Sequence, residues 1–347
     1  MAYYLGIDLH KTQFTVSVFG SSEPIVQYPT TSEGYAGLKN RISGWIHNGS
    51  EVHVGVESTG NTRFFKYQME EAGAKVTVIN TLRFKVINQS TKKTDKHDAA
   101  KIAEFLAINM LPEAHLCSRE SENLRRLLKV RRELIVSSVR IKNEIHSILT
   151  SLGIKDKNLF SKKGRQFVLA FLTSQGDKKL ETMSVGNMCD IIDTLQKKIR
   201  DIENQCDALT KNDIVVRRLL TLPGCGIITA WTIRAYTDDI SRFESAKKYA
   251  AYCGLVPWVQ SSNEKTYIGR ITKHGPQELR TAYVQFVMAL LRSKKTQNWR
   301  VVKRYKIIKE KASSGKSIIA TARKLAEIVW TILTQEKDFD ESFMTEE

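Results

Sequence analysis

The first 110 residues alternate between runs with a period of two and stretches with helical spacing. The strand-like runs are YYLGIDL, QFTVSVF, PIVQYPT, EVHVGVES and KVTVI. Apolar residues at every second position predict half-buried strands, and three consecutive runs joined by short turns predict a meander. Helical patterns at about 35–46, 63–72 and 95–108 complete a β-β-β-α-β-α-β-α order, which is typical of a mixed α/β layer fold.

Two long helical patterns follow. Positions 119–152 carry leucine and isoleucine at helical spacing, and a second stripe steps by three and four from Ile192 to Leu209. Such steps form a heptad seam. The seam fits an antiparallel helical hairpin, a coiled coil across protomers, or a stripe packed on the protein's own core.

At 347 residues the chain exceeds what one hydrophobic core usually supports. We predict an α/β domain over 1–112, a helical and coiled-coil connector over 113–215, a helical domain over 216–335 and a disordered acidic tail over 336–347. No apolar run is long enough to span a membrane, and no secretory leader is evident. The five cysteines are widely spaced without a CxxC pair. They indicate neither a disulfide framework nor a zinc site, so a reducing cytoplasm is expected.

The net charge of +17 is unevenly distributed. Positions 261–324 hold 16 basic and 3 acidic residues, whereas positions 1–60 hold 3 basic and 5 acidic residues. A strong basic surplus usually means attraction to a polyanion, although charge can also serve solubility alone. We therefore expect the C-terminal part to bind nucleic acid and the N-terminal part to have another role.

Four carboxylates stand where the predicted strands end and a helix begins. Asp8 ends the first strand, where Gly6 leaves room for a close backbone, and Glu57 ends the fourth. Asp95 and Asp98 are three residues apart at a helix start and so share one face. Sites in α/β folds gather at strand ends, and hard divalent cations prefer oxygen ligands. The group predicts a metal site for phosphodiester chemistry.

These patterns also have plain structural interpretations. A strand-end Asp, or an Asp pair in a first helical turn, more often serves as a cap or a helix-dipole partner. His10 and His97 lie near the carboxylates in sequence. A role as metal ligand or proton shuttle competes there with the commoner surface or outer-shell role.

Two motifs in the C-terminal half fit contact with phosphate. LPGCG places Gly224 and Gly226 in a tight turn before a helix, which aims backbone N–H groups at a phosphate. A plain corner between two helices is the alternative. Downstream, Ser261 and Ser262 lie in a predicted polar loop that leads to a basic helix start. The loop is followed by the cations Lys265, Arg270 and Lys273. Serines in polar loops are usually only solvated, so the residues alone leave a nucleophile open.

The chain resembles the DEDD insertion-sequence transposases of the "IS one-ten" type, which include relatives of Piv-type DNA invertases and the bridge-RNA-guided recombinases. The resemblance spans nearly the whole chain. It is carried, in this order, by GIDLHK, GVESTG, KTDKHDAAKIAEFL, LPGCG, YCGLVPWVQSSNEKTYIGRITKHG and GKSIIATARKLAEIVWTIL.

This resemblance implies an RNase H-like (RuvC-like) catalytic domain that uses Mg²⁺ or Mn²⁺ and a helical transposase domain with a nucleophilic serine. The four acidic residues of the family fall here on Asp8, Glu57, Asp95 and Asp98. The register of the serine selects Ser262, but Asn263 replaces the usual glycine and Ser261 precedes, so both serines stay open. The family also implies a noncoding guide RNA and a homo-oligomer, dimer or tetramer, in which the acidic domain of one protomer meets the serine domain of another.

We therefore expect a transposase that cuts and rejoins DNA at element ends and target, acting in a prokaryotic cytoplasm at the nucleoid. The first alternative is a Holliday-junction resolvase or nuclease that uses the same carboxylates without a covalent serine. The second is a non-catalytic nucleic-acid-binding protein, whose carboxylates would be caps and surface charges.

Overall fold

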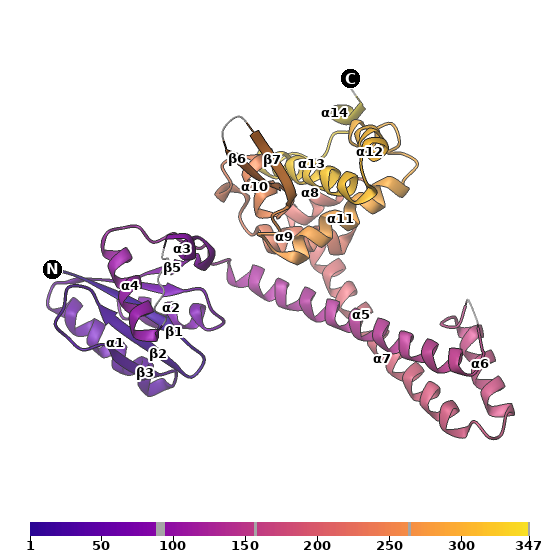
Figure 1. Ribbon diagram of the computed structural model, residues 1–347, viewed down its shortest axis with the longest axis horizontal. Coiled ribbons are helices and arrows are strands. Elements are labelled where there is room, and N and C mark those ends of the chain that lie inside the picture. The colour runs from indigo at the N-terminus through magenta and orange to yellow at the C-terminus, as the bar shows by residue number, and fades with distance from the viewer. Residues whose placement is uncertain (88–93, 156–157, 263–264, 346–347) are drawn as a thin grey trace. The chain divides into compact units, whose positions relative to one another are not determined.

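The computed structural model describes residues 1–87, 94–155, 158–262 and 265–345 (Figure 1). The chain divides into two compact units, Met1–Cys117 and Ser118–Glu347. The first unit extends past position 112, and the predicted connector and helical domain both belong to the second. Among the described residues, no helix combines the length and apolar character needed to cross a membrane.

A five-stranded mixed sheet forms the centre of the first unit. Its strands are β1 (Ala2–Leu9), β2 (Gln13–Val18), β3 (Val26–Pro29), β4 (Glu51–Glu57) and β5 (Lys75–Ile79). The spatial order is β3-β2-β1-β4-β5. The first three strands pair antiparallel, which confirms the predicted meander, and β4 and β5 continue the sheet in parallel with β1.

Different helices cover the two faces of this sheet. They are α1 (Ser32–His47), α2 (Thr62–Glu71), α3 (Thr81–Ile87) and α4 (Asp95–Ala107). Leu5 of β1 shares a core with Leu38 of α1 and Phe65 of α2. Since side chains alternate along a strand, the next residue, Gly6, belongs to the opposite face, and α4 packs directly against it. The α/β fold expected from the alternating runs is therefore present, with the short helix α3 in addition.

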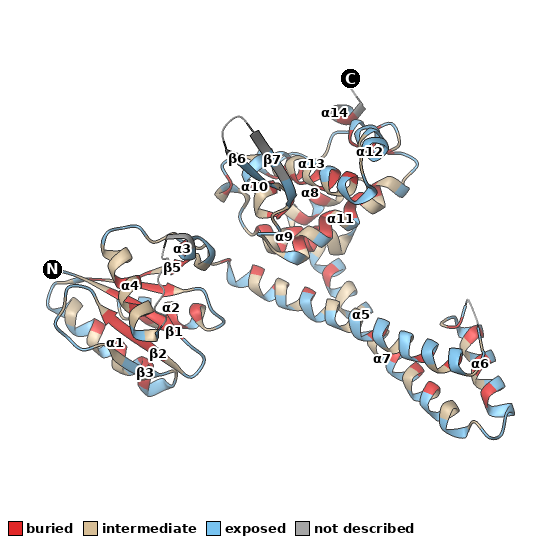
Figure 2. Ribbon diagram, viewed as in Figure 1, coloured by how far each residue is buried: buried red, intermediate tan, exposed pale blue. Residues whose placement is uncertain are grey.

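The second unit begins with a helical hairpin. Helix α5 (Arg119–Ser151) packs along α7 (Lys179–Thr210), with α6 (Lys162–Ser174) near its far end (Figure 1). Along the predicted seam of α7, Ile192 and Cys206 are buried but Leu209 is 44% exposed, and exposed residues cover much of the hairpin (Figure 2). The hairpin thus forms within one chain, and a coiled coil between protomers stays a prediction.

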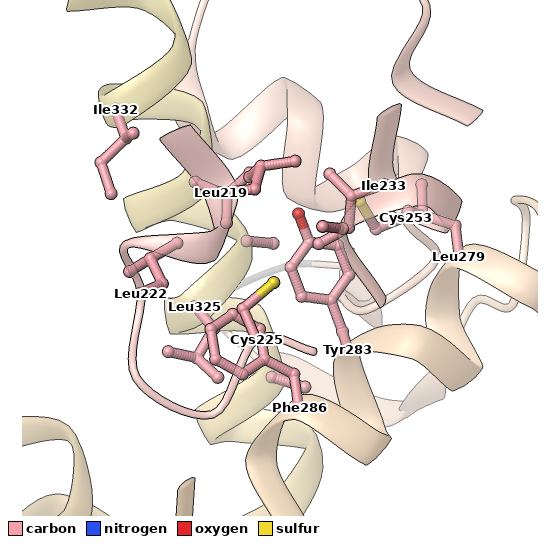
Figure 3. Packing of buried hydrophobic residues seen from close by; sticks show 14 of the residues in the cluster. Leu219, Leu222, Cys225, Ile233, Cys253, Leu279, Tyr283, Phe286, Leu325 and Ile332 are labelled. Atoms are coloured by element: carbon pink, nitrogen blue, oxygen red, sulfur yellow. The ribbon is translucent and has the colours of Figure 1, made fainter. Parts of the chain in front are cut away.

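The remaining helices build one large core. They are α8 (Ile214–Leu220), α9 (Ile227–Thr237), the 3-10 turn η1 (Ile240–Arg242), α10 (Ala246–Tyr252), α11 (Gln277–Arg292), α12 (Arg300–Lys311), α13 (Ser314–Gln335) and α14 (Ser342–Thr345). Figure 3 shows Cys225 from the turn before α9, Tyr283 and Phe286 from α11, and Leu325 from α13 converging in it. The Tyr283 hydroxyl is 2.9 Å from that of Tyr249, so this buried polar group is hydrogen-bonded.

A two-stranded ribbon replaces the polar loop and basic helix start that we expected around the serines. Strand β6 (Pro257–Ser262) pairs antiparallel with β7 (Lys265–Ile271). Val259 lies opposite Ile268, and Gln260 lies opposite Tyr267. β-Branched and aromatic residues such as Val259 and Tyr267 favour strands, and this preference outweighs the polar composition of the segment.

The acidic tail also differs from the expected disorder. The Trp299 indole donates a hydrogen bond to Glu341 Oε1 at 3.0 Å, and its ring lies 5.2 Å from that of Phe339. Met344 is buried against the helical core. The physical reason is that Phe339 and Met344 interrupt the acidic run and bury apolar surface, which compensates for the ordering of a charged segment.

Candidate functional site

Two of the predicted site carboxylates lie side by side at the carboxyl ends of the adjacent strands β1 and β4. Ile7 pairs with Val56 in the parallel register of β1 and β4, so Asp8 and Glu57 occupy the next position on each strand. Residues in register point to the same face of a sheet. Asp8 is only 9% exposed, and Glu57 is half-buried.

Glycines in both strands bring α4 onto that face. A Cβ added at Gly6 would overlap the backbone carbonyl of Ala99 and the backbone nitrogen of Ala103. A Cβ at Gly55 would lie 2.9 Å from side-chain atoms of Ile102 and Leu111. The absence of side chains at these two positions therefore lets the helix backbone approach the sheet. This matches the close approach expected at Gly6.

The first turn of α4 supplies the other two carboxylates. The Thr94 hydroxyl caps the helix by accepting a hydrogen bond from the His97 backbone N–H at 3.2 Å. Asp95 and Asp98 follow the cap and are not the cap themselves. They still lie where the helix dipole favours negative charge, and the close packing of α4 brings this turn toward Asp8.

The charges of the four carboxylates act on one another. Burial raises the pKa of Asp8, the negative charges of Asp95 and Asp98 raise it further, and His10 lowers it. Burial likewise raises the pKa of Glu57, and so do the charges of Asp8 and Asp98. Like charges held together in a partly buried place disfavour ionisation. The structure thus gathers all four predicted residues into one electrostatic cluster.

His10 lies outside the predicted set of site residues, but its ring contacts two of them. Its Nε2 lies 3.1 Å from Asp8 Oδ2 and 3.5 Å from Asp95 Oδ1. One donor atom each from Asp8, His10 and Asp95 lie within 4.8 Å of one another, a spacing that a metal ion could bridge. The signal was present in the sequence, because residues two apart at a strand end point the same way.

The segment after β4 fixes the backbone of Glu57. The Thr62 hydroxyl donates a hydrogen bond to the Glu57 carbonyl at 2.7 Å and accepts one from the Thr59 N–H at 2.7 Å. Thr62 is itself 1% exposed. The GVESTG motif therefore has a local structural task, which is to hold the strand end that carries Glu57.

The LPGCG turn in the second unit is in part structural. Gly224 has a φ of +91°, and a Cβ there would lie 3.0 Å from the Leu290 nitrogen of α11. A side chain at this position would be strained and crowded. Gly226 is exposed and precedes α9, with no side-chain cap on the helix. Of the two predicted phosphate contacts, only Gly226 lies at an accessible helix start.

Both candidate serines lie at the end of β6. Ser261 pairs with Thr266 and Ser262 with Lys265 in the ribbon. The side chains of these residues lie outside the described part of the chain, as does Asn263. Arg270 and Lys273 are exposed. These two predicted contacts are therefore accessible to an anion.

The fold of the first unit and the family matches of the chain together indicate its class of protein. The first unit is an α/β domain with a mixed sheet, and carboxylates gather where two of its strands end. A DEDD transposase model matches residues 5–154, and this match implies an RNase H-like fold for the domain. A second model, described as the transposase IS116/IS110/IS902 family, matches residues 216–303.

Curated relatives agree with both matches. A probable family 20 transposase of Pseudomonas aeruginosa is 24% identical over 82% of this chain and 84% of its own length. The transposase for insertion sequence element IS1111A of Coxiella burnetii is 28% identical over 72% and 69%. A pilin gene-inverting protein of Moraxella bovis is 25% identical over 97% of both chains. The chain belongs to the IS110-type family of DEDD transposases and is an enzyme of the transposase and DNA-recombinase class.

Proposed function

We propose that this protein is a metal-dependent recombinase of an insertion sequence, which cuts and rejoins DNA at the element ends and the target. The observation that carries the proposal is the convergence of Asp8, Glu57, Asp95 and Asp98 from two strands and one helix. Helix caps and surface charges gain nothing from such a place, where neighbouring carboxylates make Asp8 and Glu57 harder to ionise.

The residues present fit a divalent cation. All four side chains offer carboxylate oxygens, the donors that Mg²⁺ and Mn²⁺ prefer. Burial, and after it the neighbouring negative charges, raise the pKa values of Asp8 and Glu57, and positive charge between the carboxylates would offset both effects. When bound, such ions would stabilise the negative charge on the attacking and leaving oxygens of a phosphodiester.

The serine would supply the covalent step. Its oxygen forms a bond to phosphorus while the bond from phosphorus to the departing sugar oxygen breaks, and its proton leaves to a base. The phosphodiester energy is thereby kept for rejoining. We assign this role to Ser262, with Ser261 as the alternative. We propose that the acidic domain of another protomer completes the site in a dimer or tetramer.

Nucleic-acid binding would fall to the basic second unit. Exposed Arg270 and Lys273 follow the ribbon that carries the serines, and Gly226 opens α9 at the surface. Cations in such positions neutralise phosphates and release counterions. The resemblance to bridge-RNA-guided recombinases extends the proposal to a noncoding guide RNA. The Moraxella bovis relative is a pilin gene-inverting protein, and gene inversion also requires cutting and rejoining of DNA.

A trapping experiment tests the chemistry. The full chain would be incubated with a suicide DNA substrate and Mg²⁺ and then denatured. We expect DNA to remain covalently bound to Ser262. Ser262→Ala should remove the adduct, and Asp8→Ala should prevent it with DNA binding unchanged. Mixing these two variants should restore part of the activity if protomers share sites.

Other outcomes would redirect the assignment. An adduct on Ser261 would move the nucleophile by one residue. Normal cutting by both Ser261→Ala and Ser262→Ala, without adduct, would indicate a hydrolytic junction resolvase. DNA binding without any cleavage, with or without metal, would indicate a non-catalytic protein.

A further inference from the structure

We propose that His10 is a direct nitrogen ligand of the metal centre, which makes this a mixed nitrogen and oxygen site rather than an all-carboxylate one. The inference rests on the proposed function, because it assigns an additional ligand to the same centre. It predicts that the site holds Mn²⁺ or Co²⁺ more tightly, relative to Mg²⁺, than four carboxylates would.

The local backbone places His10 for this task. His10 directly follows β1, and its ring lies beside Asp8 of that strand and Asp95 of α4. The His10 N–H donates a hydrogen bond to the Gln13 carbonyl at 2.9 Å, which closes the turn into β2. The ring is thereby held at the sheet end, next to the first turn of α4.

The distances suit a common ion. Donors at about 2.1 Å from an octahedral Mg²⁺ or a similar ion lie roughly 3.0 Å apart when they are neighbours in the coordination shell. His10 Nε2 lies 3.1 Å from Asp8 Oδ2 and 3.5 Å from Asp95 Oδ1. His10 Nε2 therefore stands near the spacing of an adjacent ligand from both carboxylates, and all three donors lie within 4.8 Å of one another.

The exposure of His10 and the chemistry of imidazole also support a role as metal ligand. The His10 side chain is 51% exposed, so an ion that still carries water molecules can reach the nitrogen. Imidazole suits transition metals better than Mg²⁺, whereas carboxylates serve both. The alternative is an outer role, in which His10 only orients Asp8 by the hydrogen bond between them.

The test measures metal binding and ligand identity in the full chain. Mn²⁺ would be added to the metal-free protein, and electron spin echo modulation would detect any nitrogen bonded to the ion. Titration calorimetry with Mg²⁺, Mn²⁺ and Co²⁺ would give the affinities. His10→Asn is the main variant, and its thermal unfolding would be compared with that of the wild type. His53→Asn is the matched control, since His53 Nε2 also contacts a carboxylate, Glu51, at 3.3 Å.

We expect a nitrogen signal in the wild type and in His53→Asn, and its loss in His10→Asn. Co²⁺ affinity should fall at least about tenfold in His10→Asn, and Mg²⁺ affinity should fall less. If Mn²⁺ binds, and Asp8→Asn abolishes binding, but the wild type gives no nitrogen signal, His10 is not a ligand while the metal site stands. If the wild type binds none of the three ions, both proposals are overturned.

Discussion

The unit Met1–Cys117 contains 12 basic and 11 acidic residues, whereas the unit Ser118–Glu347 contains 42 and 26. The nearly neutral unit holds the carboxylates of the candidate site partly buried where two strands end, with raised pKa values at Asp8 and Glu57. The basic unit displays cations such as Arg270 and Lys273 on its surface and fills its core with apolar and aromatic side chains.

The difference between the two units shows that clustering the candidate site carboxylates lowers the folding stability of the sheet unit. Like charges gathered in a partly buried place oppose folding until a cation joins them, so the sheet unit must be stabilised elsewhere. Its close contact between α4 and the glycines of β1 and β4 is one such source. Exposed cations remain solvated, and the helical unit can carry many of them at little cost to its core.

The largest effect is expected where the sheet unit is most tightly packed. Gly6→Ala should destabilise it by about 3 kcal/mol, because the new methyl would overlap the backbone of α4 and packed cores tolerate added volume poorly. Hydrogen exchange of the β1 and β4 amides measures this locally. Gly44→Ala in α1 is the control, because a Cβ there meets nothing within 4 Å. Equal protection in Gly6→Ala and the wild type would contradict the close packing.

Replacing a carboxylate of the cluster is expected to have a smaller effect of opposite sign, a gain in the stability of the sheet unit. Asp8 has a raised pKa in the folded state, so its charged form costs stability above that pKa. In metal-free protein at pH 7, Asp8→Asn should therefore raise the unfolding free energy of the sheet unit by about 1 kcal/mol. The gain should fade as the pH falls through the raised pKa and should vanish below the ordinary value of 3.8, where the carboxyl is protonated in both states.

Hydrogen exchange of the same amides across pH would follow the gain in Asp8→Asn. Glu51→Gln provides the control, because the hydrogen bond and charge of Lys75 lower the pKa of that exposed carboxyl at the other end of β4. Its loss should leave stability unchanged or lower it. A decrease in stability for Asp8→Asn at pH 7 would show that the cluster is not under electrostatic strain.

The smallest effect is expected on DNA binding by the basic unit. Arg270→Ala and Lys273→Ala should each weaken duplex binding a few-fold and reduce the log–log salt slope by about 0.9, as for the loss of one phosphate contact. Fluorescence anisotropy across salt concentrations measures the slope. Lys75→Ala serves as the matched control, since Lys75 pairs with Glu51 in the sheet unit. Unchanged slopes in both variants would place the nucleic-acid surface elsewhere.

Local patterns in the sequence determined a large part of this protein. Alternating apolar runs predicted the meander of β1, β2 and β3, because burial of one sheet face requires a period of two. Asp8 and Glu57 could be assigned to strand ends for the same reason, and helical spacing predicted the long pair α5 and α7. In each case the decisive interactions lie within one element or between neighbours in the chain.

Contacts between distant segments were decided only by the tertiary structure. Gly55 matters because α4 crosses it, and His10 belongs with Asp95 because that crossing brings the helix start to the sheet end. The ribbon around Ser262 and the docking of the tail on Trp299 also depend on pairing and burial that composition does not reveal. Periodicity predicts which face a side chain occupies, but the partner across that face is fixed only when the whole core packs.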